Sequence, residues 1–279
     1  MNRIPGLAAL VVALTLVSQS ASAVKFHDTV AKAQAEAKQG NKYIIVDLFA
    51  DWCGWCHRME REVFPSEVFQ AAAKNYSLLK LDTEDGKEGT KVATDYGVRS
   101  LPTFLVLTPD LALVGIVRGY SPAEQFLEQV QGVEAEYLEY KKRLRTEPKT
   151  ANDRDKLTLT EEMVERRDLA RAEPRLVALT KSSNAGIRDE AYNQLAGLYG
   201  LQGKWPNAEA TLKQALAVNQ RGELAEQNQM ALAQVYMSVR NFPAAVTELK
   251  RFKTRYPNSK MVPSVNAIIP QLESQIPRK

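Results

Sequence analysis

The protein contains only two cysteines, Cys53 and Cys56, and two residues separate them. An apolar run, 43–49, precedes the pair and a strongly helical segment, 57–62, follows it, so we expect a strand-to-helix junction. The first turn of a helix offers unpaired backbone N–H groups and the positive end of the peptide dipoles. Both favour a thiolate, which is the nucleophile in disulfide exchange. The pattern predicts a redox dithiol in which Cys53 attacks and Cys56 resolves.

A purely structural disulfide is the alternative for this pair. Two residues of spacing close a very small loop, which removes little entropy from the unfolded chain. A bridge that stabilises a domain of this size should link distant segments. The short spacing therefore favours a working dithiol.

The five residues from Cys53 to His57 also read Cys-x-x-Cys-His, the motif of covalent haem attachment. A haem site usually needs a distal ligand, and the only other histidine is His27, although Met59 lies nearby. Because this interpretation leaves the preceding strand without a role, a haem carrier is kept only as a minor alternative. Zinc lacks a ligand set, and we expect neither a metal nor a cofactor.

Length and composition allow two ordinary domains. The chain has 279 residues, of which 44% are hydrophobic and 25% charged, as is typical of a folded protein. The net charge of +4 arises from interleaved acidic and basic residues. Nothing in this pattern indicates nucleic-acid binding.

The N-terminus is typical of a cleavable signal peptide. Arg3 supplies a positive charge, and residues 7–17 form an apolar core too short to span a bilayer comfortably. Ala21 to Ala23 matches the small-x-small cleavage pattern. We expect cleavage after Ala23 and a periplasmic or secreted protein that begins at Val24. An uncleaved membrane anchor is the alternative.

Residues 24–145 show the alternation of an α/β domain. We expect strands over 43–49, 76–81, 103–107 and 113–118, and helices over 26–38, 67–74 and 91–96 and after Ser121, the expected N-cap. The last two strands read as a hairpin. The order αβαβαβ followed by βα predicts a small sheet with helices on both faces.

Three separated motifs in this region resemble the thioredoxin family. They are VDLFADWCGWCHRM, the strand end at Lys80, and VRSLPTF before the third strand. The resemblance covers about residues 25–133 and is, in particular, to the periplasmic C-terminal domain of DsbD-type electron conductors. It implies a central mixed sheet and thiol–disulfide exchange. Gly54-Trp55 departs from the usual Gly-Pro between the cysteines, which leaves the redox potential open.

The resemblance also implies catalytic partners for the dithiol. Asp47 matches the family's buried acid, and Lys80 matches the usual partner of that acid. Burial of a lone carboxylate raises its pKa, which suits a proton acceptor for Cys56. A hydrogen-bonded structural acid that never titrates is the alternative for Asp47.

Substrate-binding residues follow from the same resemblance. A cis bond is implied between Leu101 and Pro102, which would present the Leu101 backbone to an extended substrate segment. An ordinary trans proline at the start of a strand is the alternative. Trp52, Gly54 and Trp55 complete the expected set, with Trp55 exposed to partner proteins. For both tryptophans the alternative is simple packing.

The second half of the chain is different in character. Residues 146–158 are polar and are interpreted as a linker, so the expected order is a signal peptide over 1–23, an α/β domain over 24–145, this linker, and a helical domain over 159–279. Beyond residue 158 the chain becomes rich in Ala, Leu and Glu.

Two similar units, 195–215 and 232–257, are offset by about 37 residues and resemble tetratricopeptide repeats, whose period is about 34. We expect a helix pair in each unit, with Pro206 and Pro243 at the start of the second helix. Because two units are fewer than the usual three, a degenerate pair is expected over 161–181 and a capping helix over 261–275.

These features favour an exported thiol–disulfide oxidoreductase of reductase or isomerase type. Its expected partners are protein thiols and disulfides, a protein docked on the repeats, and a membrane electron donor, but no nucleic acid. The alternative is an assembly or adaptor protein whose repeats are the working surface.

Overall fold

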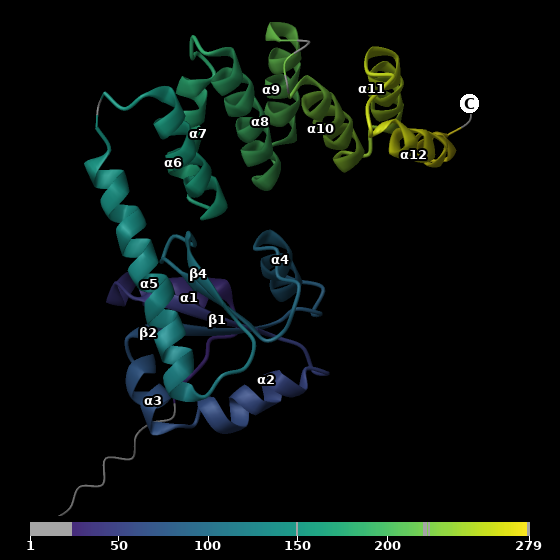
Figure 1. The fold of residues 1–279 in the computed structure, drawn as a ribbon. Coiled ribbons are helices and arrows are strands. Elements are labelled where there is room, and N and C mark those ends of the chain that lie inside the picture. The colour runs from purple at the N-terminus through teal and green to yellow at the C-terminus, as the bar shows by residue number, and fades with distance from the viewer. Residues whose placement is uncertain (1–23, 149, 220–221, 223, 278–279) are drawn as a thin grey trace, which may run out of the picture.

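The computed structural model describes residues 24–148, 150–219, 222 and 224–277. The expected signal peptide, 1–23, lies outside these residues. Figure 1 shows an α/β domain and a row of helices, connected by the long helix α5 (Ala123–Thr146). In the described part of the chain, no helix is both long and apolar enough to cross a membrane.

The α/β domain is built on a mixed sheet. Its strands are β1 (Tyr43–Phe49), β2 (Tyr76–Asp82), β3 (Thr103–Leu107) and β4 (Leu113–Arg118), in the order β2-β1-β3-β4. β1 runs parallel to β2 and antiparallel to β3, and β3 and β4 form the expected hairpin. The strand predictions are confirmed, with β2 one residue longer than expected.

Helices cover both faces of the sheet, as the order of elements predicted. They are α1 (Val30–Gly40), α2 (Gly54–Arg58), the π-helical turn η1 (Met59–Val63), α3 (Glu67–Ala73), α4 (Glu88–Asp95) and α5. Ala33 and Ala37 of α1 pack on one face, where α4 also lies. Phe69 of α3 and Phe126 of α5 pack on the other face, together with Met59.

The first helix begins later than the expected range of 26–38. Thr29 is the N-cap, and its side chain accepts a hydrogen bond from the Lys32 N–H. Before this cap the chain is extended, because His27 exchanges backbone hydrogen bonds with Leu78 and Lys80 of β2, at 2.8 and 3.0 Å. Pairing with the sheet edge therefore prevails over the helical spacing of the apolar residues.

The start of α5 also differs from expectation. Pro122 occupies the N-cap position and the helix begins at Ala123. The Ser121 hydroxyl is buried and has no hydrogen-bond partner among the described residues. The predicted Ser121 cap is therefore wrong.

The remainder of the described chain is helical. Its elements are α6 (Asp153–Glu165), α7 (Leu169–Leu179), α8 (Ala185–Leu201), α9 (Trp205–Val218), α10 (Ala225–Ser238), α11 (Phe242–Arg255) and α12 (Val262–Ser274). Helix α6 packs with α7, α8 with α9, and α10 with α11. Pro206 and Pro243 lie in the first turns of α9 and α11, as expected. The connection between α5 and α6 is shorter than the expected linker of 146–158, because α6 begins directly after its N-cap, Asn152.

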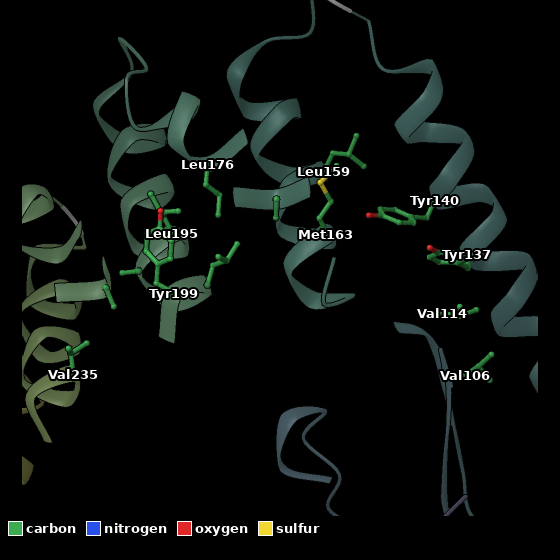
Figure 2. Packing of buried hydrophobic residues seen from close by; sticks show 14 of the residues in the cluster. Val106, Val114, Tyr137, Tyr140, Leu159, Met163, Leu176, Leu195, Tyr199 and Val235 are labelled. Carbon is green, nitrogen blue, oxygen red and sulfur yellow. The ribbon is translucent and has the colours of Figure 1, made fainter. Parts of the chain in front are cut away.

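One apolar cluster runs from the sheet into the helical region. Figure 2 shows Tyr137 and Tyr140 of α5 between the sheet residues Val106 and Val114 and the α6 residue Met163. Because these side chains are buried together, the α/β domain and the helical region pack against each other and are not joined by a linker alone.

Polar contacts join the same regions at the start of β4. The Leu113 N–H donates to the Arg166 carbonyl at 2.5 Å, and the Arg166 guanidinium donates to the Val114 carbonyl at 2.9 Å. The guanidinium carbon also lies 4.8 Å from the centre of the Tyr140 ring. The turn after α6 therefore covers part of the outer edge of β4.

Gly115 of β4 permits the close approach of α5. A Cβ atom at this position would lie 2.3 Å from the Cβ of Val133, which has no room to move within a helix. Gly132, one residue earlier on α5, is exposed, and a Cβ there would meet nothing within 4 Å.

We therefore expect opposite effects from alanine at these two glycines. Gly115→Ala should lower the free energy of unfolding by about 1–3 kcal/mol through overpacking. Gly132→Ala should raise it by up to about 1 kcal/mol, because alanine favours a helix interior. Urea denaturation of the two variants checks this, and a neutral Gly115→Ala would contradict the close packing of α5 on β4.

Candidate active site

The two cysteines lie just beyond the end of β1. Cys53 is the N-cap of α2, and its Sγ accepts a hydrogen bond from the Cys56 N–H at 3.1 Å. The two sulfurs form a disulfide with an S–S distance of 2.11 Å. Each cysteine is only 3% exposed. The expected strand-to-helix junction is confirmed, and the N–H donor at Cys53 Sγ is of the kind that favours a thiolate.

Asp47 is buried in the middle of β1, on the same face as Ile45 and therefore on the side where Met59 packs. It is 1% exposed, and its Oδ1 has no hydrogen-bond partner among the described residues. Burial raises the pKa of Asp47 to about 7, although the charge of Lys80 opposes the rise and the charge of Glu60 adds to it. A carboxyl group with such a pKa can accept and release a proton near neutral pH.

Lys80 lies directly across from Asp47 in the pairing of β1 with β2. Its ammonium group forms an ion pair with Glu60 and lies 4.3 Å from the centre of the Phe49 ring. Lys80 is thus beside the acid, as expected, but it forms its ion pair with Glu60. Partial burial acts to raise the pKa of Glu60, but the hydrogen bond and the charge of Lys80, together with His57, hold it below its usual value.

Glu60 was not among the expected site residues. The signal was present, because Glu60 follows Cys56 by four residues and so lies on the same face of the helical segment. Glu60 also faces Nδ1 of His57 at 3.4 Å, while His57 Nε2 lies 2.8 Å from the Asp51 carbonyl. The hydrogen bond with the Asp51 carbonyl raises the pKa of His57 most, and the hydrogen bond with Glu60 raises it further.

The peptide bond between Leu101 and Pro102 is cis, as the family resemblance implied. Thr103, the next residue, pairs with Leu48 near the end of β1, so this bond lies at the edge of the sheet that carries the disulfide. The Pro102 carbonyl accepts from the Gly119 N–H at 2.9 Å. Within the described chain, the Leu101 backbone has no hydrogen bond.

Trp55, between the cysteines, is 55% exposed and belongs to a cluster that the sequence did not reveal. Its ring centre lies 5.5 Å from that of Tyr120, and the Arg58 guanidinium lies 4.3 Å from the Tyr120 ring. Glu62 accepts hydrogen bonds from Arg58 Nε at 2.9 Å and from the Tyr120 hydroxyl at 2.6 Å. The contacts hold a solvent-facing aromatic surface beside the disulfide.

Trp52 and Gly54 also lie where expected, on either side of Cys53. Trp52 is 68% exposed, and its indole N–H donates to Glu84 at 2.8 Å. Gly54 is the first residue of α2, and a Cβ there would meet nothing within 4 Å. The tryptophans, Gly54, the cysteines and the Leu101-Pro102 bond thus lie at one end of the sheet, and Asp47 and Lys80 lie within the neighbouring strands β1 and β2. The roles of all these residues remain predictions.

The haem alternative finds little support in this geometry. Both sulfurs of the Cys-x-x-Cys-His motif are joined to each other, and both ring nitrogens of His57 face protein oxygens.

The raised pKa of Asp47 predicts a pH-dependent stability. Between the ordinary pKa of 3.8 and about 7, the unfolded chain releases this proton and the folded protein keeps it. The free energy of unfolding should therefore fall as pH rises through this range, by roughly 4 kcal/mol at most. Asp47→Asn should remove the slope, as measured by denaturation of the oxidised protein at several pH values. Thr103→Val, a buried change that does not titrate, should leave the slope intact.

The neighbouring charges should move the pKa of Asp47 in opposite directions. Glu60→Gln removes a negative charge and should lower it, whereas Lys80→Met removes a positive charge and should raise it. Carboxyl carbon NMR titration of Asp47 measures both. An Asp47 pKa that is the same in the two variants would show that burial alone sets it.

Comparison with known proteins agrees with this geometry. A family model described as a thioredoxin-like domain matches residues 30–134. The thioredoxin of Alicyclobacillus acidocaldarius subsp. acidocaldarius is 31% identical over 98 residues, which are 35% of this chain and 88% of that protein.

The thiol:disulfide interchange protein DsbD of Pseudomonas fluorescens is 34% identical over 100 residues, 32% of this chain. The chain spans only 17% of the length of that relative. The oxidised C-terminal domain of Neisseria meningitidis DsbD matches with a TM-score of 0.34 and 24% identity, over 39% of this chain and 98% of that one. Because the chain is 31% identical to the Alicyclobacillus thioredoxin and covers 88% of that protein, it belongs, through its α/β domain and its Cys-x-x-Cys disulfide, to the thioredoxin-like family.

Proposed function

We propose that the protein is an exported thiol–disulfide oxidoreductase of reductase or isomerase type that acts on protein disulfides. The observation that carries this proposal is the Cys53–Cys56 disulfide, which caps a helix on the same side of the sheet as the buried carboxyl group of Asp47. The names of the DsbD relatives describe thiol–disulfide interchange in those proteins.

In the reducing direction, the Cys53 thiolate attacks one sulfur of a substrate disulfide. A Cys53–substrate bond forms, the substrate S–S bond breaks, and the departing sulfur takes up a proton. Cys56 then gives its proton to Asp47 and attacks Cys53, which releases the second substrate sulfur. Two electrons pass from the dithiol to the substrate, and a donor dithiol must restore the reduced pair.

The surroundings of the disulfide suit an extended protein substrate. The unpaired Leu101 backbone offers hydrogen bonds to a strand-like segment, and Trp55 offers an exposed aromatic face. Because Trp55 is fixed by its contacts with Tyr120 and Arg58, little conformational entropy is lost when a partner packs against it.

The helical region is proposed to dock a protein partner, and a membrane electron donor is a candidate source of electrons. The tetratricopeptide-like spacing of its two units supports the docking role, since such repeats stack into extended surfaces. The fixed packing of α6 and α7 on the α/β domain would hold a docked protein at a constant orientation to the disulfide.

Trapping tests the proposal directly. Cys56→Ala removes the resolving thiol, so mixed disulfides on Cys53 should accumulate with exported proteins and appear as slow bands on non-reducing gels. The double variant with Cys53→Ser should form none. An absence of adducts while Cys53 is still alkylated by iodoacetamide would overturn disulfide exchange. Full activity of Cys53→Ser in cells would instead favour the adaptor alternative.

A further inference from the structure

A cavity of about 700 Å³ lies where the helical region meets the α/β domain. Its walls come from the start of β1, the turn between β3 and β4, α5, and the turn from α6 into α7. Because Leu113 pairs with Leu107 and Leu107 with Ile44, this is the end of the sheet away from the disulfide. The volume is within the usual range for small-molecule sites, about 300–1,000 Å³.

The charged lining of this cavity is predominantly positive. It comprises the four cationic side chains Lys42, Lys141, Arg167 and Arg171 and the two acidic side chains Asp110 and Asp168. We propose that the cavity binds a small anionic molecule that carries a phosphate or carboxylate group on a flat ring.

Two of the cations already have acidic partners. Lys42 pairs with Glu36 at 2.9 Å, and Arg171 pairs with Asp168. The remaining acid of the lining, Asp110, is paired with a lysine outside the cavity at 3.2 Å. Because the charges within these pairs largely cancel, the other two cations, Lys141 and Arg167, determine the net positive charge of the cavity.

Lys141 and Arg167 have no acidic partner in the described part of the chain. The Lys141 ammonium lies 5.9 Å from the centre of the Tyr137 ring, and Arg167 donates to the Asp95 main-chain carbonyl. An anion placed between them would gain charge-assisted hydrogen bonds without breaking an existing ion pair.

The start of α7 adds donors of the right kind to this cationic wall. Its first residues, Leu169 to Arg171, line the cavity, and the Asp168 side chain makes no capping hydrogen bond to them. Backbone N–H groups in the first turn of a helix lack helical partners and attract anions. They reinforce the two unpaired cations.

An aromatic wall suggests the shape of the ligand. Tyr43 and Tyr137 both line the cavity, and their rings meet edge to face with centres 6.2 Å apart. Because Tyr137 is buried, the partly exposed Tyr43 offers the accessible ring, and a flat ligand could pack against it while its anionic group faces Lys141 and Arg167.

Calorimetric titration of the mature protein at fixed ionic strength tests the site. Phenyl phosphate and benzoate are the probes, and phenol is the neutral control. We expect at least one anion to bind and phenol not to bind, and the preferred probe to distinguish phosphate from carboxylate. The double variant Lys141→Gln, Arg167→Gln should weaken binding by at least about tenfold. If that variant does not fold, Lys141→Gln alone decides by the same criterion.

The matched control removes two positive charges from exposed positions of α5, the helix that carries Lys141. Lys142→Gln with Arg145→Gln should change affinity by less than about twofold, because exposed charges act weakly. The proposal is overturned if neither anion binds, if phenol binds as well as phenyl phosphate, or if the control pair loses as much affinity as the cavity pair. Loss confined to the cavity variants supports it.

Discussion

The burial of one carboxyl group sets the electrostatics at the centre of the α/β domain. Asp47 is enclosed within β1 with one oxygen unpaired, so its charged form is disfavoured. The charge of Lys80 lowers the pKa of Asp47 and the charge of Glu60 raises it. Because the two residues form an ion pair with each other, their effects on this pKa partly cancel. The outcome is a carboxyl group that titrates near neutral pH, and the remainder of the domain maintains the dry environment that this requires.

That environment is produced by packing on the same face of the sheet. Met59 follows the dithiol helix, and Phe69 and Phe126 come from two further helices, so three elements enclose the apolar side of β1. Gly115 contributes indirectly, because it allows α5 to lie close to β4. The surroundings of Asp47 thus depend on residues far from the cysteines in the sequence.

Much of this arrangement was predictable from local patterns. The apolar runs located β1 and β3 to the residue, and the cysteine spacing and the Leu101-Pro102 motif pointed to the disulfide and the cis bond. What could not be predicted depends on contacts between distant segments. Tyr120 approaches Trp55 only after the hairpin folds back, and His27 pairs with β2 despite helical spacing around it. The spacing of Glu60 from Cys56 is a local pattern, but its ion pair with Lys80 joins distant segments and could not be predicted from the sequence.

Both outer strands of the sheet are partly occupied by the protein itself. His27 takes hydrogen-bonding positions along β2, and Arg166 takes others at the start of β4. An open strand edge is a template on which a second polypeptide can assemble into aggregates. Once these two short segments are in place, the sheet is sheltered from such assembly along part of each outer strand.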